Sequence, residues 1–136
     1  REGFGAAGAI PVGLTWLSSI LYGSEANIEL KPGAHHVAQT LGLVNLLEQA
    51  QSLGEQTLII TGEGAFDEQS LTGKVVGTIA DIAKSTSSAL GIVAGRLDFA
   101  APDGALSSQL SQNGDMHEQL KAAGRAIARD FSASLR

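Results

Sequence analysis

The stretch that decides the fold runs from Thr57 to Lys74 and reads TLIITGEGAFDEQSLTGK. It begins with a short apolar, β-branched run, Leu58 to Ile60, which predicts a buried strand. The following Thr61-Gly62-Glu63-Gly64 contains two residues without a side chain, which let a backbone turn sharply and let a ligand approach the main chain. We therefore predict that the strand stops at this point and that a functional loop connects it to Lys74.

Polar side chains gather in the predicted loop. Glu63 and Asp67 are carboxylates, Ser70 is a hydroxyl, and Lys74 opens an amphipathic segment. Such groups beyond the carboxyl end of a strand are typical of the binding site of an open α/β sheet. The alternative is structural: the glycines serve a tight connection, the carboxylates are solvated, and Ser70 or Thr72 caps the next helix. Spacing alone leaves both interpretations open.

Two glycine-containing motifs do not meet the requirements of a nucleotide-binding fingerprint. A Walker A loop requires a glycine five residues before Gly73-Lys74 and a Ser or Thr after the lysine, where this chain has Glu68 and Val75. The opening Gly3 to Gly8 matches G-x-G-x-x-G, but a dinucleotide fingerprint follows a strand, and none is expected before residue 3. We interpret these small residues as a helix start that packs closely or faces an anion.

Composition predicts a single α/β segment. The 136 residues are 43% apolar but only 4% aromatic, which favours helices on a parallel sheet. A formal net charge of −5 makes nucleic acid an unexpected partner. The absence of cysteine fits a reducing cytoplasm, no apolar run has membrane-spanning length, and three histidines without cysteine disfavour a transition-metal site.

The chain divides into a helical part, residues 1–54, and a βαβ part with a closing helix, residues 55–136. In the first part, helices are predicted near residues 10–21, 34–41 and 45–52, the last with Leu46, Leu47 and Ala50 inward. In the second, apolar spacing predicts a helix over residues 75–84 with Val75 on its inner face, and a second strand over residues 90–94, stopped by Gly95.

Strand, helix and strand in succession predict a right-handed crossover with parallel strands. Residues 95–98 should then emerge at the same sheet edge as residues 62–67, where Arg96 and Asp98 either join the site or form a local ion pair. A third edge strand is predicted over residues 105–110. A closing helix begins at Gly114-Asp115, with an apolar face that starts at Met116 and Leu120.

The central motif resembles the signature of the bacterial glycerate kinase family, T-G-E-G-x-x-D-x-Q-S-x-x-G-K. Gly3 to Ala9 resembles the family's G-A-G-A-A-G-G, and Gly91 to Leu97 resembles its strand ending in A-G-S-L. The resemblance covers almost the whole chain. Family members are much longer, so it implies the C-terminal part of a two-domain α/β kinase fold with its site between the domains. The chain departs from the family at Ala65, usually Arg, at Phe66, usually Leu or Ile, and at Val76, usually Pro.

The resemblance implies phosphorylation of D-glycerate by ATP with Mg²⁺. Glu63, Asp67 and Lys74 would be the catalytic residues. Glu63 and Asp67 would hold the metal; the alternative role of Asp67 is to accept the proton of the substrate hydroxyl. Two carboxylates held together would raise the pKa of one of them. Binding of substrate or phosphate is assigned to six residues: Gly62, Gly64, Ser70, Gly5, Gly8 and, as the neutralising cation, Lys74.

The expected partners are D-glycerate, ATP, and either a second copy or the missing N-terminal part of the enzyme, which would cover apolar surface near the first helix. Alone, the chain should be inactive because it encodes one wall of the cleft. A non-catalytic module that binds a small hydroxy acid or a nucleotide is the alternative, and a fold used for assembly ranks last. The full reading frame would separate the first two possibilities.

Overall fold

The computed structural model describes residues 20, 33–72, 74–111 and 113–136. The chain forms two compact units, Arg1–Lys31 and Pro32–Arg136, and the description that follows concerns the second. Except for residue 20, the predicted helix near residues 10–21 lies outside the described residues, as do Gly5 and Gly8.

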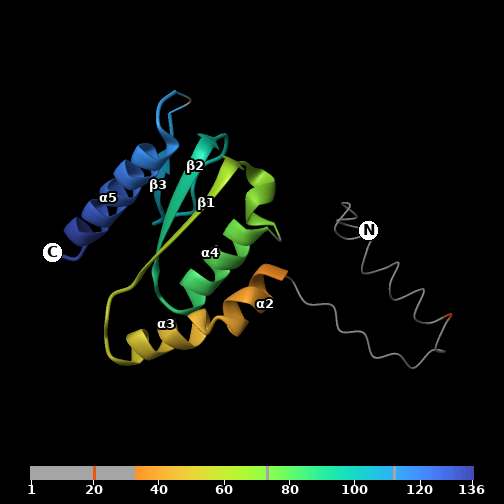
Figure 1. Cartoon of the computed structure of the whole chain (residues 1–136). Helices are drawn as coiled ribbons and strands as arrows, with labels where there is room; N and C mark the ends of the chain where they lie inside the picture. Colours follow the sequence, from red (N-terminus) through yellow and green to blue (C-terminus); the bar gives the residue numbers. More distant parts are fainter. Residues whose placement is uncertain (1–19, 21–32, 73, 112) are drawn as a thin grey trace. The chain divides into compact units, whose positions relative to one another are not determined.

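Three parallel strands form the sheet, in the order β1-β2-β3 (Figure 1). They are β1 (Leu58–Phe66), β2 (Ala89–Leu97) and β3 (Leu106–Gln109). Leu58 pairs with Ala89 at one end of the β1–β2 ladder and Phe66 with Leu97 at the other. The parallel βαβ core and the third edge strand are therefore confirmed.

Both long strands continue past the glycines that were predicted to end them. β1 includes residues 62–64 and β2 includes Gly95. A Cβ atom on Gly62 would lie 2.7 Å from the carbonyl oxygen of Val93, and one on Gly95 would lie 2.6 Å from that of Gly64. These glycines allow two neighbouring strands to lie close together and do not make the chain turn. The prediction of a loop from Thr61 onward is therefore wrong.

Helix α4 (Val75–Ser85) links β1 to β2 and covers one face of the sheet. It is preceded by the short 3₁₀ helix η1 (Glu68–Leu71). Val76 is buried with Phe66 and Ile92 in the largest apolar cluster. Val75 is 58% exposed, so its predicted inward position is wrong, and the next residue, Val76, is the one that faces inward. The helix begins at residue 75, and with 3.6 residues per turn this start carries Val76, Ile79 and Ala83 toward the sheet.

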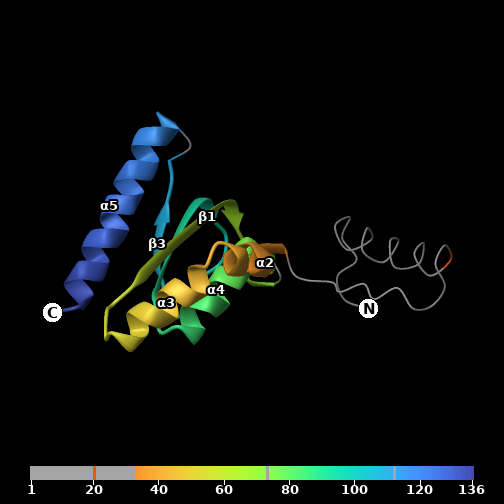
Figure 2. The same ribbon diagram turned by 60° about the horizontal axis from the view of Figure 1, so that its bottom comes forward.

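Helix α5 (Met116–Ser134) packs on the opposite face, so the sheet lies between α5 and the other helices (Figure 2). Ile127 and Ala123 are buried with Val93. Met116 and Leu120, predicted on the inner face, are 55% and 47% exposed. The apolar face of α5 extends beyond the three strands available to cover it.

Two shorter helices complete the unit. α2 (Gly33–Thr40) and α3 (Leu43–Ser52) are joined at Gly42, whose φ of 72° favours glycine. Ala38 and Leu47 are buried against Ile82 of α4. Leu46 is 64% exposed, contrary to prediction, because Leu47 and Ala50 form the inner face. Within the described residues, no helix has the length and hydropathy needed to cross a membrane.

Candidate functional site

The strongest cluster of polar groups lies just beyond the carboxyl end of β1. Asp67 caps η1, and its Oδ1 accepts hydrogen bonds from the Ser70 backbone N–H at 3.0 Å and from the Ser70 hydroxyl at 3.1 Å. The Ser70 hydroxyl oxygen lies 3.0 Å from the backbone N–H of Asp67, which donates to it. Ser70 is fully buried. Its hydroxyl therefore holds Asp67 in place and does not face a ligand. It does not cap α4, as the structural alternative expected, because Lys74 is the N-cap residue of that helix.

Lys74 adds a cation to the same cluster. It is the N-cap residue of α4, and its Nζ lies 3.5 Å from Asp67 Oδ1, with side chains 45% and 43% exposed. The first turn of a helix also presents unpaired N–H groups and a partial positive charge. One carboxylate, one ammonium group and one helix N-terminus are thus brought together at the predicted edge of the sheet.

The pKa of Asp67 is lowered from its usual value of 3.8. Partial desolvation acts to raise the pKa, but the hydrogen bond from the Ser70 hydroxyl and the positive charge of Lys74 together outweigh it. Asp67 is therefore held as a carboxylate. The expectation of a raised pKa is wrong for Asp67, because its nearest charge is a lysine and not a second carboxylate.

Glu63 lies away from Asp67. The two are four residues apart along extended backbone, and at about 3.3 Å per residue their Cα atoms are separated by roughly 13 Å. Glu63 lines a separate hollow of about 470 Å³, here called the β1 hollow. Its Oε1 is buried and has no hydrogen-bond partner among the described residues. The other residues that line the β1 hollow are Ile60, Thr61, Gly62, Val93, Leu110, Leu120 and Gly124.

The two central glycines differ in their surroundings. Gly62 is required by the close approach of Val93, whereas a Cβ on Gly64 would meet nothing within 4 Å. The main chain at Gly64 is thus open to an incoming group. This difference was not visible in the sequence, because it depends on the partner strand.

The end of β2 contributes a second pair of charges. Arg96 is the register partner of Ala65, and its Nε donates to Asp98 Oδ2. The Asp98 backbone N–H donates to the Phe66 carbonyl oxygen at 2.9 Å, which ties the two strand ends together. The expected local ion pair is present, and it lies at the same edge of the sheet as Asp67.

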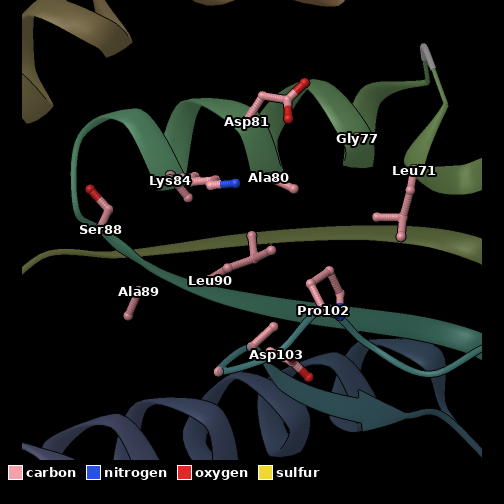
Figure 3. Close-up of a pocket in the computed structure, with 13 residues that line it drawn as sticks. Leu71, Gly77, Ala80, Asp81, Lys84, Ser88, Ala89, Leu90, Pro102 and Asp103 are labelled. Atoms are coloured by element: carbon pink, nitrogen blue, oxygen red, sulfur yellow. The ribbon is translucent and has the colours of Figure 1, made fainter.

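A larger hollow, about 580 Å³, lies on the α4 side (Figure 3). It lies between α4, the start of β2 and the turn that carries Pro102 and Asp103. Asp81, Lys84 and Asp103 are its charged lining residues. The sequence does not predict this hollow, because residues 102–105 and α4 are distant along the chain and no local pattern brings them together.

No cluster of three or more His, Cys, Asp or Glu side chains suited to a metal ion occurs in the part of the chain that the structure describes. The separation of Glu63 and Asp67 does not fit a shared ion. Asp67 alone fits one ligand position, because Mg²⁺ is commonly held by one or two carboxylates together with phosphate oxygens and water.

Comparison with known proteins relates this sequence to a family. The model of the glycerate kinase family matches residues 1–132. Uncharacterized protein Mb2228c of Mycobacterium bovis and Uncharacterized protein MT2261 of Mycobacterium tuberculosis are each 36% identical over 99 residues, covering 73% of this chain and 22% of the relative. Uncharacterized protein slr1840 of Synechocystis is 35% identical over 92 residues, covering 68% and 21%.

The chain spans about a fifth of the length of these curated relatives. No solved structure matches it. The family match extends over nearly all of the sequence and includes the Asp67, Ser70 and Lys74 cluster. The chain belongs to the glycerate kinase family.

Proposed function

We propose that this chain is part of an ATP-dependent glycerate kinase and supplies one wall of the cleft in which D-glycerate is phosphorylated. The observation that carries the proposal is the cluster of Asp67, buried Ser70 and Lys74 at the carboxyl end of β1. Phosphoryl transfer depends on positioning and charge neutralisation more than on covalent chemistry. An ionised carboxylate beside a lysine and a helix N-terminus supplies both.

Asp67 is proposed to orient the reacting hydroxyl of the substrate. Its Oδ1 is occupied by Ser70 and Lys74, while its Oδ2 has no hydrogen-bond partner among the described residues. The hydroxyl oxygen forms a bond to the γ-phosphorus as the bond to the bridging oxygen of ADP breaks, and the hydroxyl proton passes to Asp67. Its lowered pKa makes Asp67 a weak base, which suits a loose transition state in which proton transfer is late.

Lys74 and the N-terminus of α4 are proposed to neutralise the transferred phosphoryl group, which approaches the open main chain at Gly64. Ser70 is a positioning residue for Asp67. Mg²⁺ would supply neutralisation of phosphate charge, and Asp67 Oδ2 would help to hold it only in the alternative in which this oxygen does not accept the hydroxyl proton. Glu63 has no role in this proposal, because it lines the separate β1 hollow, roughly 13 Å along the extended backbone from Asp67, and a three-carbon substrate held at Asp67 does not reach it.

The test is a coupled assay of ADP release with D-glycerate, ATP and Mg²⁺ on the full-length protein that carries this segment. We expect turnover in the usual enzyme range, about 1–10³ s⁻¹. The products are analysed by phosphorus NMR to identify the phosphorylated hydroxyl. ATP consumption with no phosphoglycerate, or no consumption at all, would overturn the proposal.

The second candidate is a non-catalytic module that binds a hydroxy acid or nucleotide. Ala65 favours it, because a methyl group stands at a position beside Arg96 where the family usually has a further cation. Calorimetry on the same full-length protein separates the candidates. Binding of D-glycerate or ATP without turnover would support the module.

A further inference from the structure

Arg96 occupies an unusual place at the edge of the sheet. It is one residue before the end of β2, directly across from Ala65 of β1, and Ala65 is two residues before Asp67. Neighbouring strands lie about 4.8 Å apart. The backbone of Arg96 is therefore adjacent to the strand segment that leads into the Asp67 cluster.

The guanidinium of Arg96 is available to a ligand. The side chain is 60% exposed, and the methyl group of Ala65 is too short to cover it. Only Nε is used in the hydrogen bond to Asp98, so among the described residues Nη1 and Nη2 have no hydrogen-bond partner. These two nitrogens form the end of the planar fork that binds a carboxylate through two parallel hydrogen bonds.

Stability does not explain this arrangement. Asp98, the partner of Arg96, is two residues away and its side chain is 40% exposed. Ion pairs of this kind contribute little to folding. They do restrict the rotamers of a long side chain, which lowers the entropy lost when a ligand binds. Asp98 is itself held by its backbone hydrogen bond to Phe66. The pair thus presents a fixed cation toward solvent.

We propose that Arg96 binds the carboxylate of the hydroxy-acid substrate and determines the selectivity for an acid over a neutral polyol. This inference rests on the proposed function. A carboxylate is favoured over a phosphate because Lys74 and the α4 N-terminus already provide a point charge and N–H groups on the β1 side. The planar fork of Arg96 matches the planar carboxylate group.

The experiment measures KM and kcat for D-glycerate, for glycerol and for ATP in the full-length protein and in three variants. We expect Arg96→Ala to raise KM for D-glycerate by about 10- to 100-fold, since a hydrogen-bonded charge contributes about that factor. KM for ATP should stay within about twofold. Arg96→Lys should recover part of the loss, because it keeps the charge without the fork.

Glycerol lacks the carboxylate, so the preference of the wild-type protein for D-glycerate over glycerol should shrink in Arg96→Ala by the same factor. Arg129→Ala is the matched control, because Arg129 is also exposed and paired with a nearby carboxylate, Asp130, but lies on α5. Melting temperatures and the Arg96→Lys variant guard against misfolding. An unchanged KM for D-glycerate, or a rise confined to KM for ATP, would overturn the assignment of Arg96.

Calorimetric titration with D-glycerate keeps this inference separate from the proposed function. If the wild-type protein binds D-glycerate without turnover and Arg96→Ala does not bind it, the kinase proposal fails while the Arg96 assignment stands. If the wild-type protein turns over D-glycerate and Arg96→Ala is indistinguishable, only the Arg96 assignment fails. Absence of both binding and turnover in the wild-type protein overturns both.

Discussion

At the scale of single residues, the position of Asp67 and its ionisation have the same cause. The hydroxyl and backbone N–H of Ser70 both donate to Asp67 Oδ1, and Lys74 Nζ lies 3.5 Å from the same oxygen. These contacts cap η1 and also lower the pKa of the carboxyl group. The contacts that make Asp67 a helix cap therefore also keep its carboxylate ionised at the edge of the sheet.

The substitution Asp67→Asn tests the negative charge of Asp67 separately from its role as the N-cap of η1. Asparagine is as good an N-cap as aspartate, so the cap should survive while the negative charge is lost. In the full-length enzyme we expect kcat to fall by about 10²-fold or more, in the range that general-base groups contribute, with only a small decrease in the unfolding midpoint at neutral pH, from loss of the charge. Steady-state kinetics and urea unfolding on one preparation check this. A variant that keeps its kcat would remove Asp67 from the site.

The lowered pKa of Asp67 predicts a pH dependence of stability. Because the pKa is lower in the folded chain than the usual 3.8, the carboxylate contributes its stabilisation fully above that value and loses it as pH falls through the folded value. The difference in urea midpoint between the wild-type chain and Asp67→Asn should therefore be constant near neutral pH and shrink below about pH 4. A difference that grows on acidification would contradict the ion pairing.

Ser70→Ala should affect both stability and activity. The substitution removes a fully buried hydroxyl that exchanges hydrogen bonds with Asp67. We expect a loss of about 1–2 kcal/mol in the free energy of unfolding, as for a lost helix cap, and a fall in kcat because Asp67 is no longer held. Thr72→Ala is the control, since Thr72 is exposed nearby. Equal effects in the two variants would show that Ser70 has no special role.

At the scale of elements, glycines decide how closely the strands lie. Gly62 faces the Val93 carbonyl and Gly95 faces the Gly64 carbonyl, each too near for a side chain. On the opposite side of β2 from α4, Gly91 leaves room for Ile127 of α5, whose Cγ2 would be 2.7 Å from an added Cβ. Gly62, Gly91 and Gly95 are thus packing residues of a sheet that is covered on both faces.

Gly62→Ala and Gly64→Ala should therefore behave differently. Gly62→Ala forces a methyl group against backbone, and we expect it to destabilise the fold by about 1–3 kcal/mol. Gly64→Ala meets nothing within 4 Å, and its φ is not positive. Its stability should change by less than about 0.5 kcal/mol, while KM for ATP rises if phosphate approaches this backbone. Unfolding curves and kinetics on both variants test this, and matching profiles would refute it.

At the scale of the whole molecule, the two hollows lie where helix cover ends. α4 packs mainly on β1 and β2, and α5 mainly on β2 and β3. The β1 hollow lies over the strand that α5 covers least, and the larger hollow lies between α4, the start of β2 and the turn that precedes β3. Ile60 and Leu120, both about half exposed, border the first of these.

The isolated chain should show no turnover of D-glycerate, because it spans about a fifth of its curated relatives and contributes one wall of the proposed cleft. The same ADP-release assay is run on the isolated chain and on the full-length protein at equal concentration. Circular dichroism on the isolated chain first establishes that it is folded. Turnover by the isolated chain near the full-length rate would contradict the division of the site between two parts.

Much of the fold follows from the sequence because it depends on local pattern. The β-branched run at Leu58–Ile60, the helix after Lys74 and the closing helix after Asp115 all appear where periodicity and capping residues predict them. Their order along the chain also predicts the parallel pairing of β1 and β2. The polar residues beyond β1 could be predicted to lie together as a candidate site because the sequence indicates both a strand and the helix that follows it.

What the sequence could not determine depends on the partner of each residue. Whether Gly62 marks a turn or a close approach of two strands is decided by Val93, which is 31 residues further along the chain and is its register partner. Glu63 and Asp67 look like neighbours in the sequence, but extended backbone separates them, and the carboxylate of Asp67 meets Lys74 instead. Arg96 stands beside Ala65 only because the strands pair in this register. Local pattern determines the elements, and packing between distant elements determines which functional groups meet.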